Sequence, residues 1–366
     1  HGPWYQDLES VENTLKYIFE KLHHNCYILC SSGNEFEFIK LESSTTAPSL
    51  KPYLEQKLNK TIKGQKRKSL LKTIRKKQWR VMQCIVKEFS NGSFATEFQE
   101  FLNSLNGKIP EGIFVFSLTD AQILREDGKE PWQMITGSKD LGLYKFNKHL
   151  PLLAYSGQQG YWDIPIPTQD DIDYVKNPQD IPNIEWSQKI QKAVFRGNPT
   201  GCGYTTETNM RLKISTLKSS LLDAGIIQNK SSSLKFDPIE GLGELNQPQI
   251  KKVPKLDLIN EQIKFKYIVH IDGNVLAYRL LKSMLLGSLI LRVRSPYIHW
   301  LDHIMEEGKH FIYVKEDLSD LEQRIEWCIQ NDTKAKKIAQ QGQRFAQKVL
   351  TSDFINKYFL KLLKCL

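Results

Sequence analysis

Long apolar runs are absent from this sequence of 366 residues. No stretch approaches the roughly 18 to 20 apolar residues that a helix needs to cross a bilayer. The first residues, His1-Gly2-Pro3, lack the layout of a signal peptide, and the last residues carry no retention tetrapeptide. We therefore expect a cytoplasmic protein, with the endoplasmic reticulum or Golgi lumen as the alternative if a leader was removed.

Cysteine is scarce, and its spacing argues against two kinds of structure. Only Cys26 and Cys30 of the six cysteines lie close together, and none forms the paired CxxC array of a structural zinc site. The density is too low for a secreted scaffold, so we interpret most as buried free thiols, with one or two disulfides left open. The histidines do not combine with cysteines or carboxylates at metal-ligand spacing, so no metal site is predicted.

Several catalytic signatures are also missing. The chain has no G-x-S-x-G turn, no set of kinase motifs and no G-x-x-x-x-G-K-[ST] phosphate loop. An acidic triplet, Asp170, Asp171 and Asp173, is similar to a metal-binding motif. It lies in a polar segment rich in Pro and Asn, so we expect helix-capping carboxylates there.

Positive charge is abundant but unevenly distributed. The net charge is +10, and much of the excess lies in residues 51–80, where basic residues recur through a helix-like stretch. Apolar residues recur at helical spacing in the same stretch, which favours a solvated helix face. An anionic acceptor, a membrane surface and nucleic acid are the alternative partners.

Short apolar runs alternate with helical patterns, which predicts an α/β fold with parallel sheets. The runs cover residues 113–118, 151–156, 192–197, 265–271, 289–293 and 310–314. The length leaves room for two domains. We expect a first domain at 1–187, rejoined by a C-terminal helix at 351–366, and a second at 188–350. After a helix at 210–222, the chain through residue 255 has too loose a pattern to assign.

Two glycine-containing turns follow predicted strands in the second domain. Gly197 and Gly201 let backbone amides approach an anion, and Arg196 and Arg211 can bind phosphate oxygens. After residues 272–274 we expect a helix that begins near residue 275 and turns its amino end and Arg279 toward the same crevice. A glycine turn alone is more often only a turn, but two such sites indicate a nucleotide pocket.

Asp120 is the candidate general base. It follows the buried run 113–118, and the carboxyl end of such a strand is where α/β proteins place chemistry. A lone Asp after a strand is more often a cap. Transfer of a group to a hydroxyl, however, needs one base near the acceptor oxygen, with cations at the departing anion.

The ordered motifs resemble those of the protein O-glucosyltransferase and fungal capsule xylosyltransferase family, also called glycosyltransferase family 90 or the lipopolysaccharide-modifying-enzyme domain. The resemblance covers most of residues 108–348. It is carried by residues 195–201 with Arg211, 265–273, Tyr278-Arg279 with Ser283, 287–291, and 310–314 with 317–321.

This resemblance implies a GT-B fold, in which two Rossmann-like domains with parallel sheets face a central cleft. It also implies an inverting, metal-independent enzyme that needs no cofactor and moves glucose or xylose from a UDP-sugar to a glycan or protein hydroxyl. Asp120 matches the catalytic position, and Asp163 and Pro165 match the acceptor-side loop. The nucleotide-sugar positions are Arg196, Gly197, Asn198, Thr200, Gly201, Arg211, Gly273, Asn274, Val275, Leu276, Ala277, Tyr278, Arg279 and Ser283.

The chain departs from the family pattern in two places. Residues 204–209 are extra, which affects the Arg211 assignment, and His299-Trp300-Leu301 stands where an acidic residue and two aromatics are usual. Three other functions stay open: a GT-B transferase with another donor, a nucleic-acid-binding protein that uses residues 51–80, and a degenerate transferase that serves as a scaffold. The sequence does not fix the sugar, the acceptor or the oligomeric state.

Overall fold

The computed structural model describes residues 8–22, 24, 26–41, 92–129, 131, 140–201, 206–227, 235–237, 241–243 and 250–366. The chain divides into two compact units, unit 1 (His1–Ile166 with Tyr358–Leu366) and unit 2 (Pro167–Lys357). The basic stretch at 51–80 lies outside the described residues. Within the described part, no helix has the length and apolar character needed to cross a bilayer.

Unit 1 contains a five-stranded sheet in the order β2-β1-β3-β4-β6. The strands are β1 (Cys26–Ser31), β2 (Phe36–Leu41), β3 (Gly112–Ser117), β4 (Leu152–Ala154) and β6 (Ile164–Pro165), and a short β5 (Gly157–Gln158) follows β4. β3, β4 and β6 run parallel, whereas β1 runs antiparallel to both β2 and β3. The sheet is therefore mixed, with a parallel part (β3, β4 and β6) and an antiparallel part (β1 and β2). The reason is the short connection between β1 and β2, which only an antiparallel hairpin allows.

Helices pack on the sheet of unit 1. They are α1 (Leu8–Lys16) with a π-helical turn η2 (Tyr17–Lys21), α4 (Gly92–Ser104), and the last part of α11 (Ser352–Cys365). Alternate residues of β3 point to opposite faces, so Val115 packs with α1 residues such as Leu15. Phe116 packs with Phe98 of α4 at 5.2 Å and with Phe359 of α11 at 6.3 Å between ring centroids.

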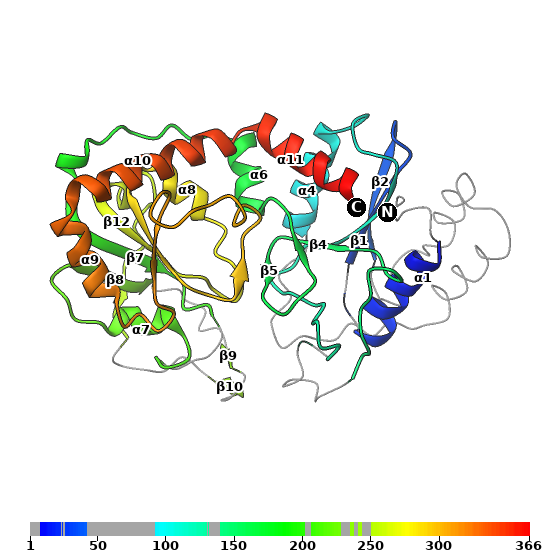
Figure 1. Cartoon of the computed structure of the whole chain (residues 1–366), viewed down its shortest axis with the longest axis horizontal. Coiled ribbons are helices and arrows are strands. Elements are labelled where there is room, and N and C mark those ends of the chain that lie inside the picture. The colour runs from blue at the N-terminus through cyan, green and yellow to red at the C-terminus, as the bar shows by residue number, and fades with distance from the viewer. Residues whose placement is uncertain are drawn as a thin grey trace. The chain divides into compact units, whose positions relative to one another are not determined.

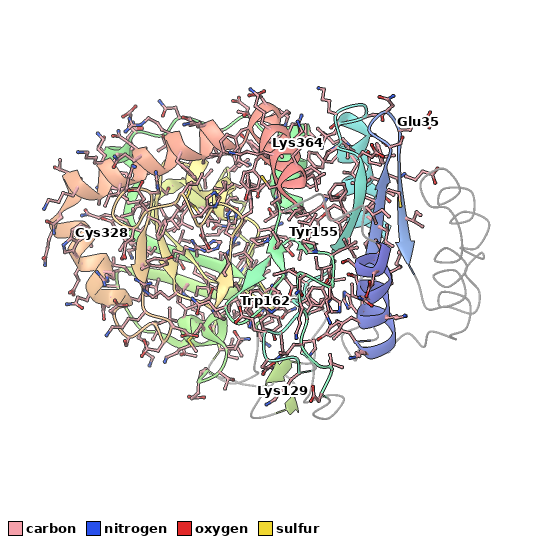
Figure 2. All side chains as sticks on the ribbon, turned by 45° about the vertical axis from the view of Figure 1, so that its right-hand side comes forward. Glu35, Lys129, Tyr155, Trp162, Cys328 and Lys364 are labelled. Carbon is pink, nitrogen blue, oxygen red and sulfur yellow. The ribbon has the colours of Figure 1, made fainter. Side chains whose placement is uncertain are left out.

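The aromatic cluster on that second face fixes the end of the chain to unit 1. Phe359 is fully buried and lies 5.9 Å from Phe98 and 5.2 Å from Phe101. Tyr155, labelled in Figure 2, is buried directly after β4 and lies 6.1 Å from Phe98. The core of unit 1 thus includes residues from both ends of its discontinuous sequence.

Unit 2 contains a six-stranded sheet in the order β11-β8-β7-β12-β13-β15, and every neighbouring pair is parallel. The strands are β7 (Ile190–Gly197), β8 (Leu222–Ile227), β11 (Lys252–Val253), β12 (Phe265–His270), β13 (Leu289–Val293) and β15 (Ile312–Val314). The strands expected at 192–197, 265–271, 289–293 and 310–314 are confirmed within a few residues. β8 lies in the segment whose pattern was too loose to assign.

The helices of unit 2 are α6 (Gln169–Lys176), α7 (Met210–Thr216), α8 (Leu280–Leu285), α9 (Leu321–Gln330) and α10 (Asp332–Val349). Smaller elements are η3 (Trp186–Gln188), β9 (Lys235–Asp237), β10 (Gly241–Gly243), η4 (Gln262–Lys264) and β14 (Tyr297–Ile298). Figure 1 shows α10 in orange beside α8, and both helices contact β13. The buried core joins strand residues such as Tyr267 and Leu291 to Ile325 of α9, where the labelled Cys328 of Figure 2 is also buried.

The boundary between the units lies at 166/167, whereas the sequence pattern predicted it at 187/188. Segment 167–187 belongs to unit 2 because its side chains bond there. Trp186 donates from Nε1 to both carboxylate oxygens of Asp332 at 3.0 Å. Lys266 forms an ion pair with the same carboxylate at 2.7 Å and lies 5.1 Å from the Trp186 ring. The return to unit 1 begins at Tyr358, inside α11.

Candidate active site

The glycine-containing loops of unit 2 lie at the point in its sheet where the strand order reverses. β7 and β12 are neighbours, but the chain leaves β7 toward β8 and leaves β12 toward β13 on the other side. At such a switch point the loops after the two strands diverge, and α/β proteins bind ligands in the crevice between them. Residues 198–201 and 271–279 are these two loops. The sequence-predicted nucleotide residues therefore come together at the carboxyl edge of one sheet.

Arg211 of α7 ties the two loops to each other. Its Nη1 donates to the Thr200 hydroxyl at 2.5 Å and to the Asn198 carbonyl at 3.3 Å. Its Nε donates to the Asp272 carbonyl at 3.0 Å, and its Nη2 to the Ile271 carbonyl at 3.0 Å. These bonds run from the buried guanidinium to the protein's own loops, and the phosphate-binding role expected for Arg211 stays a prediction.

Close packing explains why glycine and asparagine occur in these loops. A Cβ added to Gly273 would lie 3.0 Å from the Thr200 hydroxyl and 3.1 Å from Arg211 Nη2. Gly201 has a φ of +140°, which L side chains rarely adopt, and its N–H donates to the Asn274 side chain at 2.9 Å. Asn209 caps α7 and also donates to the Pro199 carbonyl at 3.2 Å. These contacts hold both loops near one another.

Asp272 organises the loop that follows β12. Its carboxylate accepts from the Ala277 N–H at 2.7 Å and from the Ser295 hydroxyl at 2.5 Å, and His270 Nε2 lies 3.5 Å away. Burial alone would raise the pKa of this carboxyl, but the His270 ring and the two donors favour the carboxylate and lower the pKa to about 2. The bond to Ala277 keeps residues 273–279 as a loop. α8 therefore begins at Leu280, which corrects the helix expected near residue 275.

Arg279 has a different environment from Arg211. Its Nη2 donates to the Arg196 carbonyl at 2.7 Å, and its own carbonyl accepts from the buried Ser283 hydroxyl at 2.9 Å. In the described part of the chain, no carboxylate lies within ion-pair distance of its guanidinium. Burial lowers the pKa of this guanidinium, and the Asp170 carboxylate opposes that effect. A partly buried cation at the edge of the loop is thus left without an adjacent anion.

Arg196 is tied to its own sheet. Its Nη2 lies 2.9 Å from both carboxylate oxygens of Asp223 on β8, and its Nη1 donates to the Asp223 carbonyl at 2.8 Å. The guanidinium therefore joins β7 to β8 in this structure, and its expected approach to phosphate stays a prediction. Gly197 ends β7 and pairs with Ile226. Val275, Leu276 and Ala277 are buried, so their side chains belong to the core of unit 2, whereas Tyr278 is half-buried.

Asp120 of unit 1 lies in a bend, three residues after the end of β3, and its side chain is half-buried. Asp163 holds the segment that follows Asp120. Its two carboxylate oxygens accept from the Ile123 N–H at 3.0 Å and the Leu124 N–H at 2.8 Å. Burial raises the pKa of Asp163 to about 6, and the backbone donors partly oppose this. Asp163 thus holds the segment after the candidate base, and Pro165 lies in β6 opposite Ala154.

One residue of the acidic triplet, Asp171, caps a helix. Thr168 and Asp171 form a reciprocal capping box at the start of α6. Asp171 also accepts from Trp300 Nε1 at 2.8 Å, and burial raises its pKa to about 7. His299, at the position that departs from the family pattern, is buried with Nε2 3.8 Å from the same carboxylate. Among the described residues, no group of three or more His, Cys, Asp and Glu side chains is arranged to hold a metal.

Sequence reasoning missed the supporting residues Asn209, Asp223 and Asp272. Asp272 immediately precedes Gly273, so its position after a strand was a usable signal for a loop-organising carboxylate. Asp223 had none, because β8 itself was not recognised.

The family model for glycosyl transferase family 90 matches residues 50–365 of the chain. The chain belongs to glycosyl transferase family 90. This membership confirms the resemblance drawn from the motifs. Two α/β units, each with its own sheet, are also the architecture that this resemblance implied.

Relatives of this family 90 chain include viral and animal proteins. "Uncharacterized protein 035R" of Invertebrate iridescent virus 3 is 28% identical, over 96% of this chain and 36% of its own length. "Protein O-glucosyltransferase 3" of Homo sapiens is 29% identical, over 59% of this chain and 41% of its own length. The chain therefore spans less than half the length of these relatives.

Some solved structures are similar to this chain at low sequence identity. Anabaena HepE in complex with UDP-glucose has 14% identity and a TM-score of 0.32, covering 48% of this chain and 49% of that one. TarM has 15% identity and a TM-score of 0.38, covering 66% of this chain and 50% of that one.

Proposed function

We propose that this chain transfers a sugar from a UDP-sugar to an acceptor hydroxyl, with unit 2 as the donor-binding lobe and unit 1 as the lobe that supplies the base. Family membership over residues 50–365 and the O-glucosyltransferase name of a relative support this proposal. The loops at the switch point of unit 2 support it independently, because such crevices bind nucleotides in many α/β proteins. Glucose and xylose are the favoured sugars, and a glycan or protein supplies the hydroxyl.

The observation that carries the proposal is Arg279. A partly buried guanidinium without a carboxylate at ion-pair distance costs desolvation energy that an anionic ligand would offset. A diphosphate matches this need, because arginine binds phosphate oxygens through two parallel N–H donors. Arg211 then acts indirectly on the diphosphate, since it holds the two loops whose backbone faces the ligand. Arg196 stabilises the β7–β8 pair beneath them.

Asp120 takes the proton from the acceptor hydroxyl in this mechanism. The acceptor oxygen forms a bond to the anomeric carbon as the bond from that carbon to the diphosphate oxygen breaks, and the leaving group departs with the electron pair as UDP. Attack from the face opposite UDP inverts the anomeric centre in one step. Arg279 stabilises the charge that develops on the leaving group, so the proposed reaction needs no metal ion.

The experiment measures UDP release from a panel of UDP-sugars, with and without excess chelator, for the wild type and Asp120→Asn. We expect slow hydrolysis of one donor that resists the chelator and falls by about 100-fold or more in Asp120→Asn, because a general base contributes about 10² to 10⁴ in rate. Asp353→Asn is the matched control, since the exposed Asp353 side chain pairs with the exposed Lys357 side chain on α11.

Three outcomes would each contradict part of this proposal. Asp120→Asn with near wild-type rates would remove the base assignment, and loss of activity in chelator would remove metal independence. If every UDP-sugar and free UDP fail to bind in calorimetry, the UDP-sugar proposal is wrong. The cytoplasmic location stays a prediction, which imaging of the tagged protein in its own host cell would check.

A further inference from the structure

A chain of hydrogen bonds lies immediately before Asp120. Ser117, the last residue of β3, is fully buried, and its hydroxyl lies 3.0 Å from His24 Nε2. The same hydroxyl lies 3.1 Å from the hydroxyl of Thr119. His24 comes from the segment between η2 and β1, and its N–H donates to the Ile18 carbonyl at 3.1 Å. Three side chains from two distant parts of the sequence are thus linked up to the residue beside the candidate base.

The hydrogen bonds among His24, Ser117 and Thr119 have a chemistry that suits the positioning of a neighbouring residue. Burial lowers the pKa of His24 to about 4, so the ring is neutral at physiological pH. A neutral ring offers Nε2 either as a donor or as an acceptor, and each hydroxyl can donate once and accept once. The hydrogen bonds among the three side chains can therefore run in either direction, and neither arrangement buries a charge.

The segment that carries Asp120 is held at both ends. On its amino side, Ser117 is fixed by pairing with Ala154 of β4 and by the bond to His24. On its carboxyl side, Asp163 accepts from Ile123 and Leu124. Between these two anchors the chain forms a bend, so the Thr119 hydroxyl is a side-chain restraint inside the bend itself.

We infer that His24, Ser117 and Thr119 are positioning residues that hold the Asp120 bend in the orientation needed for proton transfer. The inference rests on the proposed function, because it assigns these residues to Asp120 as the base. None of the three needs to touch the substrate. A general base works only within about 2.6 to 3.2 Å of the proton that it removes, and a misplacement of about 1 Å costs on the order of 100-fold in rate.

The first test compares Thr119→Val with Thr119→Ser. Valine keeps the shape of threonine but lacks the hydroxyl, whereas serine keeps the hydroxyl. With UDP-glucose as the donor and water as the acceptor, or the UDP-sugar turned over fastest if UDP-glucose is inert, we expect Thr119→Val to lower kcat about tenfold. KM and the calorimetric Kd of UDP should stay within about twofold, because unit 2 binds the nucleotide. Thr119→Ser should retain kcat within about threefold.

The second test asks whether the three residues act through one chain. Ser117→Ala, His24→Phe and the double variant His24→Phe/Thr119→Val are measured in the same assay. Residues that act as a unit give strongly non-additive losses, so the double variant should lose little more than the worse single variant. Ser104→Ala is the matched control, because that hydroxyl only donates to the Phe101 carbonyl in α4.

Thr119 is half-buried, so its variants provide the test even if Ser117→Ala fails to fold. If Thr119→Val and Ser117→Ala keep kcat within twofold while Asp120→Asn is inactive, the inference is wrong and the proposed function stands. If Asp120→Asn itself keeps near wild-type activity, the base assignment fails first. Equal losses in Thr119→Val and Thr119→Ser, or a parallel rise in the Kd of UDP, would also overturn the positioning role.

Discussion

The two units fix the loops at the carboxyl ends of their sheets with side chains that differ in charge. In unit 2, a guanidinium and a carboxylate do this: Arg211 ties two loops together, and Asp272, whose pKa is lowered to about 2, accepts from Ala277. In unit 1, the neutral His24 ring contacts Ser117, and Asp163, whose pKa is raised to about 6, accepts from two backbone N–H groups.

The difference teaches that the neighbours of a buried carboxylate decide its charge. Asp272 has a histidine ring, a hydroxyl and an N–H around it, so it stays ionised. Asp171 shows that the unit itself is not the cause, because burial raises its pKa to about 7 although it belongs to unit 2. Asp272 in unit 2 therefore keeps its charge between pH 4 and 8, whereas Asp163, which holds the segment after Asp120, titrates within that range.

The largest expected effect comes from removing the guanidinium of Arg211, which ties the two loops of unit 2 together. Arg211→Met leaves the carbonyls of Ile271, Asp272 and Asn198 without this donor, and each buried group left unsatisfied costs about 1 to 3 kcal/mol. We expect the free energy of unfolding to fall by about 3 kcal/mol or more in denaturant titrations. Arg324→Met, which removes only a partly exposed pair with Asp320, should cost less than about 1 kcal/mol. Similar values for both variants would contradict the role of Arg211.

The next effect separates ligand binding from stability within the same loops. Arg279→Met should weaken UDP binding about tenfold or more, because it removes a charge-assisted bond to phosphate. The free energy of unfolding should hardly change, since the variant also removes a partly buried cation that has no carboxylate at ion-pair distance among the described residues. Calorimetry with UDP, together with thermal unfolding, measures the two effects. Arg279→Lys tests whether charge alone suffices, and unchanged UDP affinity in Arg279→Met would exclude contact with phosphate.

The pH dependence of stability should have opposite signs at Asp163 and Asp272. Asp163 keeps its proton in the folded state between about pH 4 and 6 while the unfolded chain has lost it, so stability falls as the pH rises through this range. The slope is at most about 1.4 kcal/mol per pH unit. Asp272 stabilises the fold above about pH 4, and this contribution is lost as the pH falls toward 2.

Thermal unfolding of Asp163→Asn and Asp272→Asn against the wild type, from pH 4 to 8, measures this contrast. The difference for Asp163→Asn should change up to about pH 6 and then level off. The difference for Asp272→Asn should stay flat over the whole range. A flat difference for Asp163→Asn would show that its carboxyl is already ionised at pH 4.

The smallest expected effect is at the capping box of α6. Thr168→Ala removes the side-chain acceptor for the Asp171 N–H, and loss of such a cap costs about 1 kcal/mol. Thr168→Ser keeps the hydroxyl and should be close to the wild type. Denaturant unfolding compares the two, and equal losses would mean that the methyl group of threonine matters more than its hydroxyl.

Much of the α/β architecture could be predicted because buried parallel strands are continuous apolar runs, as in residues 265–271 and 289–293. β8 was not predicted because two of its six residues, Asp223 and Gly225, are typical of turns. Asp223 occurs in it because it pairs with Arg196, and Gly225 because a Cβ there would lie 2.5 Å from the Val253 side chain. Such requirements come from neighbouring strands, which a local pattern does not contain.

The candidate site was predictable in position but not in the partners of its arginines. Strand ends and glycines located the loops correctly, because their geometry follows from the backbone. The sequence cannot show which of several arginines meets a carbonyl, a carboxylate or solvent, since residues elsewhere in the sequence decide this. Asp223 lies 27 positions from Arg196, and Ile271 lies 60 positions from Arg211. The helix expected near residue 275 failed for a similar reason, because the side chain of Asp272 captures the Ala277 N–H.

Phe359 has a consequence for the order in which the molecule forms during synthesis. Its ring completes the core of unit 1 against Phe98 and Phe116, yet it follows the whole of unit 2 in the sequence. Unit 2 is contiguous, so all of its residues are synthesised before Phe359 is. The strands of unit 1 emerge first but must wait with an open aromatic face, and they are exposed to chaperones and to aggregation for longer than those of unit 2.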